Sequence, residues 1–300
     1  MTIPDHDPTP GARPAGTSSP HEAAENIQQM FDTIAPTYDR ANHLLSAGID
    51  RSWWNRTARA LRPILQRPEA VVLDLCCGTG DLTLALDKHR PHPQGVPHDR
   101  RGEAEAIVGL VSSTTLKSSG APSMTASSSW VGCTPSASPS NPAPILALDF
   151  SHNMLSLSLP KFANKNIVPI EADALHLPLA DNSVDLVTSA FGFRNLTSYP
   201  DGLAELHRVL RPGGQIAILE CNQPGGLVGW LYSFYFHHIL PTLGGLISGK
   251  RRAYAYLPDS VMKFPRPPQM KALIAAAGFA NPTWTSYTLG TAGLYRATKS

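Results

Sequence analysis

The sequence predicts an α/β protein built around a doubly wound parallel sheet. Short apolar runs, which are typical of buried parallel strands, alternate along most of the chain with segments whose apolar residues recur at helical spacing. The first run, residues 71–75, breaks directly into a glycine turn at 78–80, as a strand does where it meets a nucleotide-binding loop. Two further strand candidates, 283–287 and 292–297, predict a closing antiparallel pair.

Composition restricts the class of partner. The chain has 300 residues, 42% of them hydrophobic, which is ample for a sizeable core. The formal charge is +2, and lysine and arginine are scattered rather than gathered into a stripe, so we expect a small-molecule partner and no nucleic acid. The four cysteines, two of them adjacent, do not suit a disulfide framework, and we expect a cytoplasmic protein.

The N-terminal region divides into a tail and a helical part. Residues 1–20 are rich in Pro, Thr, Ser and acidic residues and carry no apolar segment of a secretory signal, so we expect a disordered tail. Apolar residues recur at helical spacing between 22 and 66, which predicts two or three helices before the first strand. We expect residues 21–300 to form a single domain.

An unusual segment interrupts that domain at about 89–144. It is rich in Pro, Ser, Thr and Gly and cannot bury enough apolar surface to offset its ordering entropy, so we expect a long flexible insertion with a short strand at 106–111. The segment contains His89, His92 and His98. No carboxylate or cysteine stands at ligand spacing to them, so we expect a solvated histidine cluster and no metal.

The remaining elements follow from the same spacing. Buried strands are predicted at 145–149, 167–170, 184–188 and 215–219. Helices are predicted at 82–87, 152–159, 203–210 and 270–277. Proline and glycine at 211–214 predict a turn that closes the helix before the last parallel strand.

Residues at successive strand ends predict a nucleoside site. The carboxyl ends of parallel strands meet at one edge of a sheet, where ligands bind. Gly78 and Gly80 would let the backbone approach a ligand closely. Asp149 ends the second strand and could accept both hydroxyls of a ribose. Asp173 with Ala174 follows the third strand, where a carboxylate could accept from the exocyclic amine of adenine.

Several segments carry a resemblance to a known family. The glycine turn and the segment at 208–214 are shared by methyltransferases at large, whereas the narrower matches are 31–39 with Asn42, 45–48, 190–195, and 256–261 with 264–265. On these residues the chain resembles the S-adenosylmethionine-dependent methyltransferases, and within them the ubiquinone/menaquinone biosynthesis C-methyltransferases. The resemblance covers about 27–87 and 145–296. It implies a Rossmann-like, seven-stranded class I methyltransferase sheet with N-terminal helices, and S-adenosyl-L-methionine as the cofactor.

The resemblance also implies roles for individual residues. It places the cofactor against Thr79 in the glycine turn, against Asp149 at the ribose, and against Asp173 and Ala174 at the adenine. The chain departs from the family at Cys76-Cys77, where many relatives have Ala-Gly. It has Ala190 where some relatives present a serine to the cofactor, so a hydroxyl contact is absent there.

The implied reaction assigns a role to Arg194 and Asn195. Methylation of a ring carbon requires a reduced quinol, preferably ionised, because a neutral quinone has too little electron density on that carbon. A guanidinium stays protonated and is no simple base, so Arg194 would hold the developing oxyanion or polarise a water, with Asn195 orienting it. The alternative is that both residues pair with Asp32 or Asp39 and only pin the N-terminal helices.

An apolar stretch at 224–249 holds no formally charged residue and five aromatic ones before position 237. It is long enough to span a membrane, but it falls inside the domain and contains His237, His238 and a Gly-Gly pair. We expect a hydrophobic helical cover for a polyprenyl tail, resting on the bilayer surface. An ordinary core helix is the alternative.

The expected activity is conversion of demethylmenaquinol to menaquinol, with a polyprenyl quinol as substrate. Methylation of a benzoquinol in ubiquinone biosynthesis, or of demethylphylloquinol, is the nearest alternative. A nicotinamide-dependent oxidoreductase is a different one, although Asp81 after the glycine turn would repel a pyrophosphate. A non-catalytic S-adenosylmethionine-binding protein is another. The sequence leaves homodimerisation and peripheral contact with the inner face of the membrane open.

Overall fold

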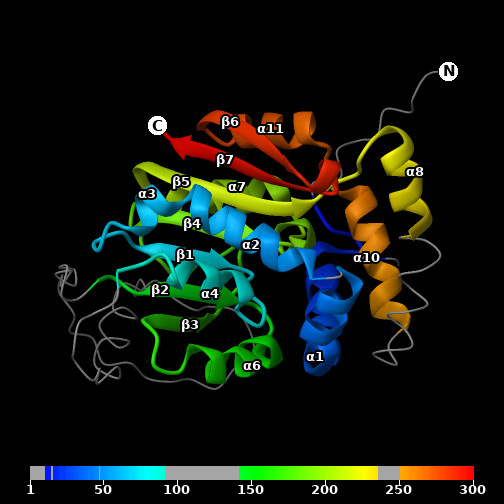
Figure 1. The fold of residues 1–300 in the computed structure, drawn as a ribbon, viewed down its shortest axis with the longest axis horizontal. Coiled ribbons are helices and arrows are strands. Elements are labelled where there is room, and N and C mark those ends of the chain that lie inside the picture. Colours follow the sequence, from blue (N-terminus) through cyan, green and yellow to red (C-terminus); the bar gives the residue numbers. More distant parts are fainter. Residues whose placement is uncertain (1–10, 15, 47, 92–141, 236–250) are drawn as a thin grey trace.

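The computed structural model describes residues 11–14, 16–46, 48–91, 142–235 and 251–300, and its core is one sheet of seven strands. The strand order is β3-β2-β1-β4-β5-β7-β6 (Figure 1). The strands are β1 (Val72–Leu75), β2 (Ile145–Asp149), β3 (Ile167–Glu171), β4 (Val184–Ala190), β5 (Leu210–Cys221), β6 (Phe279–Tyr287) and β7 (Ala292–Lys299). The strands from β1 to β5 run parallel, and β7 is antiparallel to both β5 and β6. The predicted doubly wound sheet and closing antiparallel pair are confirmed.

The described helices flank the sheet and close one end of it. They are α1 (Pro20–Leu45), α2 (Ile49–Ala60), α3 (Arg62–Leu65), α4 (Asp81–Asp87), α6 (His152–Phe162), α7 (Tyr199–Val209), α8 (Gly226–Phe234), α10 (Arg251–Lys263) and α11 (Pro267–Ala276). Short 3₁₀ turns, η1 (Phe193–Asn195) and η3 (Thr288–Gly290), follow β4 and β6. The predicted strand at 106–111, together with His92 and His98, lies outside the described residues.

Both faces of the sheet are buried because alternate side chains of each central strand enter different cores. In β1, Leu73 and Leu75 pack in one core and Val72 in the other, as the period of two in a strand requires. Helices α7 and α11 cover the first face with Leu203, Leu206 and Met270 among the buried side chains. The other face packs against residues of α2, α3 and α4. Continuous apolar runs are therefore what these strands need.

Three helices gather where the parallel strands end. Figure 1 shows α1, α8 and α10 together at the end of the sheet to which the arrows of β1, β2 and β4 point. Helix α1 begins at Pro20 because the Ser19 hydroxyl accepts a hydrogen bond from the Glu22 amide at 3.2 Å. The carboxyl edge of the sheet, where ligands bind in such folds, is thus covered by helices from both ends of the chain.

Part of the expected N-terminal tail is ordered against the domain. The Ala12 amide donates to the Leu196 carbonyl at 2.7 Å, and the Arg13 guanidinium donates to the Thr197 carbonyl at 2.8 Å. Ala12 is buried, and a Cβ on Gly11 would overlap the Thr197 backbone. The expectation of disorder over 1–20 is wrong for this stretch, because a few backbone contacts leave no periodic pattern in the sequence.

The proline and glycine segment at 211–214 forms a bulge instead of a simple turn. Val184 pairs with Leu210, and Leu186 pairs with Gln215, so the intervening residues of β5 loop out opposite a single residue of β4. Gly213 has a φ of 79°, which a residue with a side chain adopts only at a cost. The segment therefore lies inside the bounds of β5 although it interrupts the pairing.

The ends of the expected insertion are fixed close to one another. The buried Arg90 guanidinium donates to the Ala70 carbonyl at 2.8 Å and also to the Ala143 carbonyl. The Ala143 amide donates to the Pro68 carbonyl at 2.8 Å. These residues precede β1 and β2, so both ends of the insertion lie at the edge of the sheet opposite to the one where β1 and β2 end.

We predict that residues 92–141 can be replaced by a short Gly-Ser linker without loss of the fold. Arg90 already holds the two ends together, and shortening a loop lowers its closure entropy. Thermal unfolding and the dissociation constant for S-adenosylmethionine would both stay near those of the full chain. A folded deletion variant that no longer binds the cofactor would contradict this placement of the insertion.

Candidate active site

The glycine turn after β1 is held against the end of β2. Cys76, Gly78 and Gly80 all have positive φ angles of 53°, 56° and 90°. The Gly78 amide donates to Asp149 Oδ2 at 2.7 Å. A Cβ on Gly80 would overlap the Phe162 ring, so this position requires glycine for packing as well as for its φ angle. The turn therefore joins two neighbouring strand ends.

Asp149 has room for a diol. Its two carboxylate oxygens accept from the Gly78 and Ser151 amides at 2.7 and 2.9 Å. A carboxylate has about four acceptor positions, so two remain for two ribose hydroxyls. Burial raises the pKa of Asp149, and the amide hydrogen bonds act in the opposite direction. The residue predicted to hold the ribose thus has the acceptor capacity that this role needs.

Two adjoining cavities lie over the strand ends. The smaller, of about 100 Å³, is lined by Gly78, Asp149, Asp173 and Ala174. The larger, of about 330 Å³, is lined by Gly78 and Thr79 and continues under the N-terminal helices. The described residues that line both cavities are Phe31, Tyr38, Cys76, Gly78, Ala190, Phe191 and Asn195. We call the smaller one the nucleoside chamber and the larger one the acceptor chamber.

The predicted cofactor residues are brought together, with one exception. Asp173 lines the nucleoside chamber, and its carboxylate accepts from the Leu175 amide and contacts His176 Nδ1, both at 2.9 Å. Ala174 is buried in the same wall. Gly80 is absent from the described lining residues of both chambers, so its contribution is to the packing of the turn. Ala190 lines both chambers and offers no hydroxyl.

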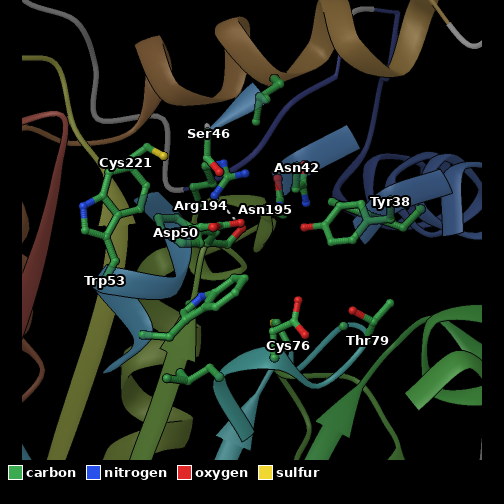
Figure 2. A pocket seen from close by; sticks show the side chains of 18 of the residues that line it. Tyr38, Asn42, Ser46, Asp50, Trp53, Cys76, Thr79, Arg194, Asn195 and Cys221 are labelled. Atoms are coloured by element: carbon green, nitrogen blue, oxygen red, sulfur yellow. Dashed lines mark hydrogen bonds between the residues drawn. The ribbon is translucent and has the colours of Figure 1, made fainter. Parts of the chain in front are cut away.

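Helix α1 is tied to the floor of the site by polar contacts. Thr79 Oγ1 donates to Asp39, whose other oxygen accepts from Lys161 Nζ at 2.7 Å. Asp32 accepts from the Ser151 hydroxyl near the N-terminus of α6. Asp32 and Asp39 therefore do not pair with Arg194 or Asn195, and the alternative in which they do is wrong. Figure 2 shows Tyr38 from the same helix pointing its hydroxyl into the pocket above Thr79.

The loop after β4 packs directly on the glycine turn. Phe191 has a φ of 58°, and a Cβ on Gly192 would overlap the Cys76 Cβ. Glycine at this position is therefore what lets the two loops touch. Strained backbone of this kind at Cys76 and Phe191, both in the chamber walls, is a feature that clusters at functional sites.

Arg194 is held by a buried carboxylate that sequence reasoning missed. Arg194 Nη1 lies 2.8 Å from Glu220 Oε2, and the Arg194 amide donates to Glu220 Oε1 at 3.0 Å. The side chains are 5% and 0% exposed. Burial opposes the charge on Arg194, but Glu220 outweighs it and raises the pKa of the guanidinium. Glu220 is the acid near the end of the fifth parallel strand. An acid at the carboxyl end of a parallel strand is a candidate site residue, and this could have identified it from the sequence.

Arg194 keeps a hydrogen-bond donor without a protein acceptor. Its Nε is buried, and no described residue accepts from it. A buried donor left unsatisfied costs about 1–3 kcal/mol, so such a group indicates a ligand or a water at this point. Arg194 lines the acceptor chamber, where an anionic oxygen could accept this bond. Asn195 lies beside it, and its Oδ1 accepts from the Tyr256 hydroxyl at 3.2 Å.

Several aromatic rings line the acceptor chamber. Trp53 packs against Phe191 with ring centroids 5.6 Å apart, and its indole nitrogen donates to the Thr288 hydroxyl at 2.7 Å. The other described aromatic residues in the wall include Trp54, Tyr232, Tyr235 and Tyr256. Figure 2 shows Arg194, Asn195, Asp50 and Trp53 around the same space. The chamber suits a flat ring with a polar edge.

Burial keeps the Cys76 and Cys77 thiols and the Tyr38 hydroxyl protonated, so none of them is available to accept a proton. It raises the pKa of Cys76 and Cys77 well above the ordinary range, so both thiols stay protonated and act as small, half-buried groups. Burial also raises the pKa of Tyr38 to about 12, although Arg194 acts in the opposite direction. The Tyr38 hydroxyl is therefore a hydrogen-bond donor at neutral pH.

The fold matches that of known proteins. A S-adenosylmethionine-dependent methyltransferase from Thermotoga maritima superposes with a TM-score of 0.53, covering 91% of this chain and 100% of that one at 13% identity. At that identity the likeness concerns the fold alone. The chain thus has the fold of the S-adenosylmethionine-dependent methyltransferases.

Sequence comparison identifies the family. The family model described as the ubiE/COQ5 methyltransferase family matches residues 20–299, and the chain belongs to this family. It is 37% identical over 287 residues to a ubiquinone/menaquinone biosynthesis C-methyltransferase from Geotalea daltonii, covering 93% of this chain and 98% of the relative. It is 36% identical to a demethylmenaquinone methyltransferase from Deinococcus radiodurans, covering 91% and 92%. The resemblance stated from the motifs is confirmed, and the oxidoreductase alternative is wrong.

One buried carboxylate gives a pH prediction. Asp74 accepts from the hydroxyls of Thr83 and Thr188, yet burial raises its pKa to about 6 from 3.8. The folded state thus binds this proton more tightly than the unfolded state, so Asp74 favours folding below about pH 4 and this contribution is lost as the pH rises through 6. We expect Asp74→Asn to remove that pH-dependent loss, which amounts to at most about 3 kcal/mol of unfolding free energy.

Chemical denaturation of both proteins at pH 4.5 and pH 7.5 measures the effect. The difference in unfolding free energy between Asp74→Asn and the unchanged chain should favour the variant more at pH 7.5. Other carboxylates contribute equally to both proteins and cancel in this difference. A difference that is the same at both pH values would show that Asp74 does not titrate in this range.

Proposed function

We propose that the protein transfers the methyl group of S-adenosylmethionine to a ring carbon of demethylmenaquinol and so forms menaquinol. The observation that carries this proposal is the aromatic acceptor chamber, which shares a wall with the nucleoside chamber and contains a buried arginine with an unused donor. Curated relatives at 36% and 37% identity over more than 250 residues are named demethylmenaquinone methyltransferases. The Geotalea daltonii relative, named for both quinones, favours a benzoquinol as the second candidate.

The proposed cofactor contacts follow the two chambers. Asp149 would bind the ribose hydroxyls, and Asp173 with Ala174 would bind the adenine. Gly78 and Thr79 would face the methionine end, because Gly78 lines both chambers and Thr79 lines the acceptor chamber. Gly78 leaves open space where a Cβ would stand, so the backbone can approach a ligand.

The proposed chemistry divides between Arg194 and the chamber walls. S-adenosylmethionine supplies an electrophilic methyl group on a sulfonium. Arg194, held as a cation by Glu220, would stabilise the quinolate oxygen through its unused Nε donor. Asn195 would orient that oxygen, and Tyr256 fixes the Asn195 amide. The aromatic walls, including Trp53 and Phe191, would hold the ring and exclude water.

Product analysis tests the proposed function. The purified protein is incubated with S-adenosylmethionine and either a demethylated naphthoquinol or a demethylated benzoquinol, each kept reduced, and the methylated product is measured by mass. We expect turnover of the naphthoquinol and a loss of at least about 100-fold in kcat for Arg194→Met, since a preorganised donor to an oxyanion contributes that much. Methylation of the benzoquinol alone would replace the proposed substrate, and cofactor binding without any product would leave a non-catalytic protein.

The outer face of α8 supports a second proposal, that the protein contacts the membrane surface. Tyr232 and Tyr235 line the acceptor chamber at the C-terminal end of this helix. Its exposed apolar side chains are Leu227 at 73%, Trp230 at 65%, Leu231 at 53% and Phe234 at 50%. Helix α8 carries no charged residue, and tryptophan favours the boundary between lipid and water.

A lipid contact at α8 would place the acceptor chamber next to the source of a polyprenyl substrate. Among the described residues no helix combines the length and the apolar character needed to cross a bilayer. We propose that the contact is peripheral and on the cytoplasmic side, with the helix as the cover for the tail that the sequence predicted. Phe236, which the same stretch contains, lies outside the described residues.

We expect the double variant Trp230→Ser, Phe234→Ser to raise KM for a long-tailed quinol more than for a short-tailed one. Loss of exposed apolar area weakens a lipid contact but leaves the ring site intact. The fraction of the variant that sediments with phosphatidylglycerol vesicles should fall as well. Sedimentation velocity without lipid reports separately whether the protein is a homodimer. Leu159→Ser on α6, which is 50% exposed, is the matched control. Equal effects on both quinols would contradict the proposed role of α8.

A further inference from the structure

A carboxylate and a histidine form a pair in the wall of the acceptor chamber. Asp50, in the first turn of α2, lines the chamber, and its Oδ2 lies 2.7 Å from His43 Nδ1 in the last turn of α1. The Asp50 side chain is 6% exposed, whereas that of His43 is 28% exposed. Figure 2 shows Asp50 in the wall of the pocket that Arg194 and Asn195 also line. The pair thus leads from the chamber towards solvent.

Asp50 differs from the other carboxylates that line the chamber. Among the described lining residues these are Asp74 and Asp81. Asp74 is fully buried and already accepts from two threonine hydroxyls. Asp81 is paired with Lys161 at 3.2 Å, which opposes its protonation. Asp50 alone among the three is bonded to a side chain of the type that exchanges protons near neutral pH.

We propose that Asp50 accepts the proton that the quinol loses during methyl transfer, and that His43 passes it to solvent. The inference rests on the proposed function, since methylation of a quinol releases one proton overall. Arg194 stabilises the quinolate but cannot take that proton, because Glu220 keeps its guanidinium charged. Asp50 is therefore the group that would touch the substrate hydroxyl, and His43 is the relay behind it.

Methyl transfer replaces a ring hydrogen with a methyl group and releases one proton. The quinol O–H bond breaks and its proton moves to the Asp50 carboxylate. The ring carbon forms a bond to the methyl carbon, while the sulfur–methyl bond breaks and its electron pair stays on sulfur as a neutral thioether. The methylated ring then becomes aromatic again as its C–H proton moves to the ring oxygen and restores the O–H bond. One proton leaves the site through His43 for each methyl group transferred.

The charges around the pair suit a transient positive His43. Trp54 contacts the His43 ring, with centroids 5.8 Å apart. Asp81 from α4 interacts electrostatically with His43, and burial raises the pKa of Asp81 while Lys161 lowers it. Arg194 from η1 is the other charged side chain among the described residues that line the chamber, and the tyrosines there are Tyr38, Tyr232, Tyr235 and Tyr256. Lys161 from α6, which pairs with Asp81, also pairs with Asp39 from α1.

The test compares Asp50→Asn with the unchanged protein between pH 6 and pH 10, using a demethylated naphthoquinol with a short prenyl chain. General base catalysis contributes about 100-fold or more, so we expect a loss of that size in kcat at pH 7. The loss should shrink towards pH 10, where a phenolic hydroxyl, with a pKa of about 10, ionises without help. Absorption of the bound quinol should show less quinolate in the variant at pH 7, a readout independent of turnover.

Further variants separate a proton relay from a structural tie. His43→Gln should lower kcat by about 10-fold, and the double variant should be no worse than Asp50→Asn, because the two residues act as one unit. Glu171→Gln is the matched control, since Glu171 contacts His152 Nδ1 at the same 2.7 Å on the surface. His43→Gln also keeps the inference testable should Asp50→Asn not fold.

The outcomes distinguish this inference from the proposed function. If the unchanged protein methylates the quinol and both variants keep its kcat and pH profile, the relay is overturned and the proposed function stands. An effect confined to KM or to thermal stability would likewise show that the pair only holds α1 against α2. If the unchanged protein methylates no quinol, both proposals fall together.

Discussion

The buried ion pair between Glu220 and Arg194 is the interaction on which the site depends. Glu220 lies near the end of the fifth parallel strand and binds both the guanidinium and the backbone amide of Arg194, so it fixes the η1 turn as well as one side chain. That turn carries Asn195, which accepts from Tyr256 of α10, and it precedes Leu196, which binds the N-terminal segment. One carboxylate thereby positions parts of the chain that are more than 200 residues apart in sequence.

Burying this ion pair costs desolvation free energy, and it leaves a charged hydrogen-bond donor that a ligand can use. Desolvation of two charges takes several kcal/mol for each ion, and hydrogen bonds of good geometry must offset it. Glu220 makes such bonds, but Arg194 retains an unsatisfied Nε. A guanidinium that is charged, desolvated and incompletely bonded interacts more strongly with an anionic oxygen than one in water. The unsatisfied Nε of Arg194 therefore lowers the stability of the folded protein at the point where charge would develop in the substrate.

Sequence reasoning recovered what local patterns encode. Apolar runs ending in glycine or in an acid located β1, β2 and the residues Gly78 and Asp149, because a strand end and a turn leave a signature a few residues long. Glu220 directly follows the strand predicted at 215–219, but it was missed because its partner lies 26 residues earlier and no local pattern links the two. Asp50 and His43 were missed because their function depends on how α1 and α2 fold over the sheet, which no local spacing encodes.

The contact between Trp53 and Thr288 has a consequence for biosynthesis. It joins the second helix to the last hairpin, and β7, the final strand in the chain, inserts between β5 and β6. Emerging from the ribosome, the chain would present its cofactor loops and first five strands long before this wall of the ring pocket exists. The pocket is thus completed only after the β6–β7 hairpin has been made, so chains that stop before it lack a closed space in which a sulfonium methyl could meet a quinol.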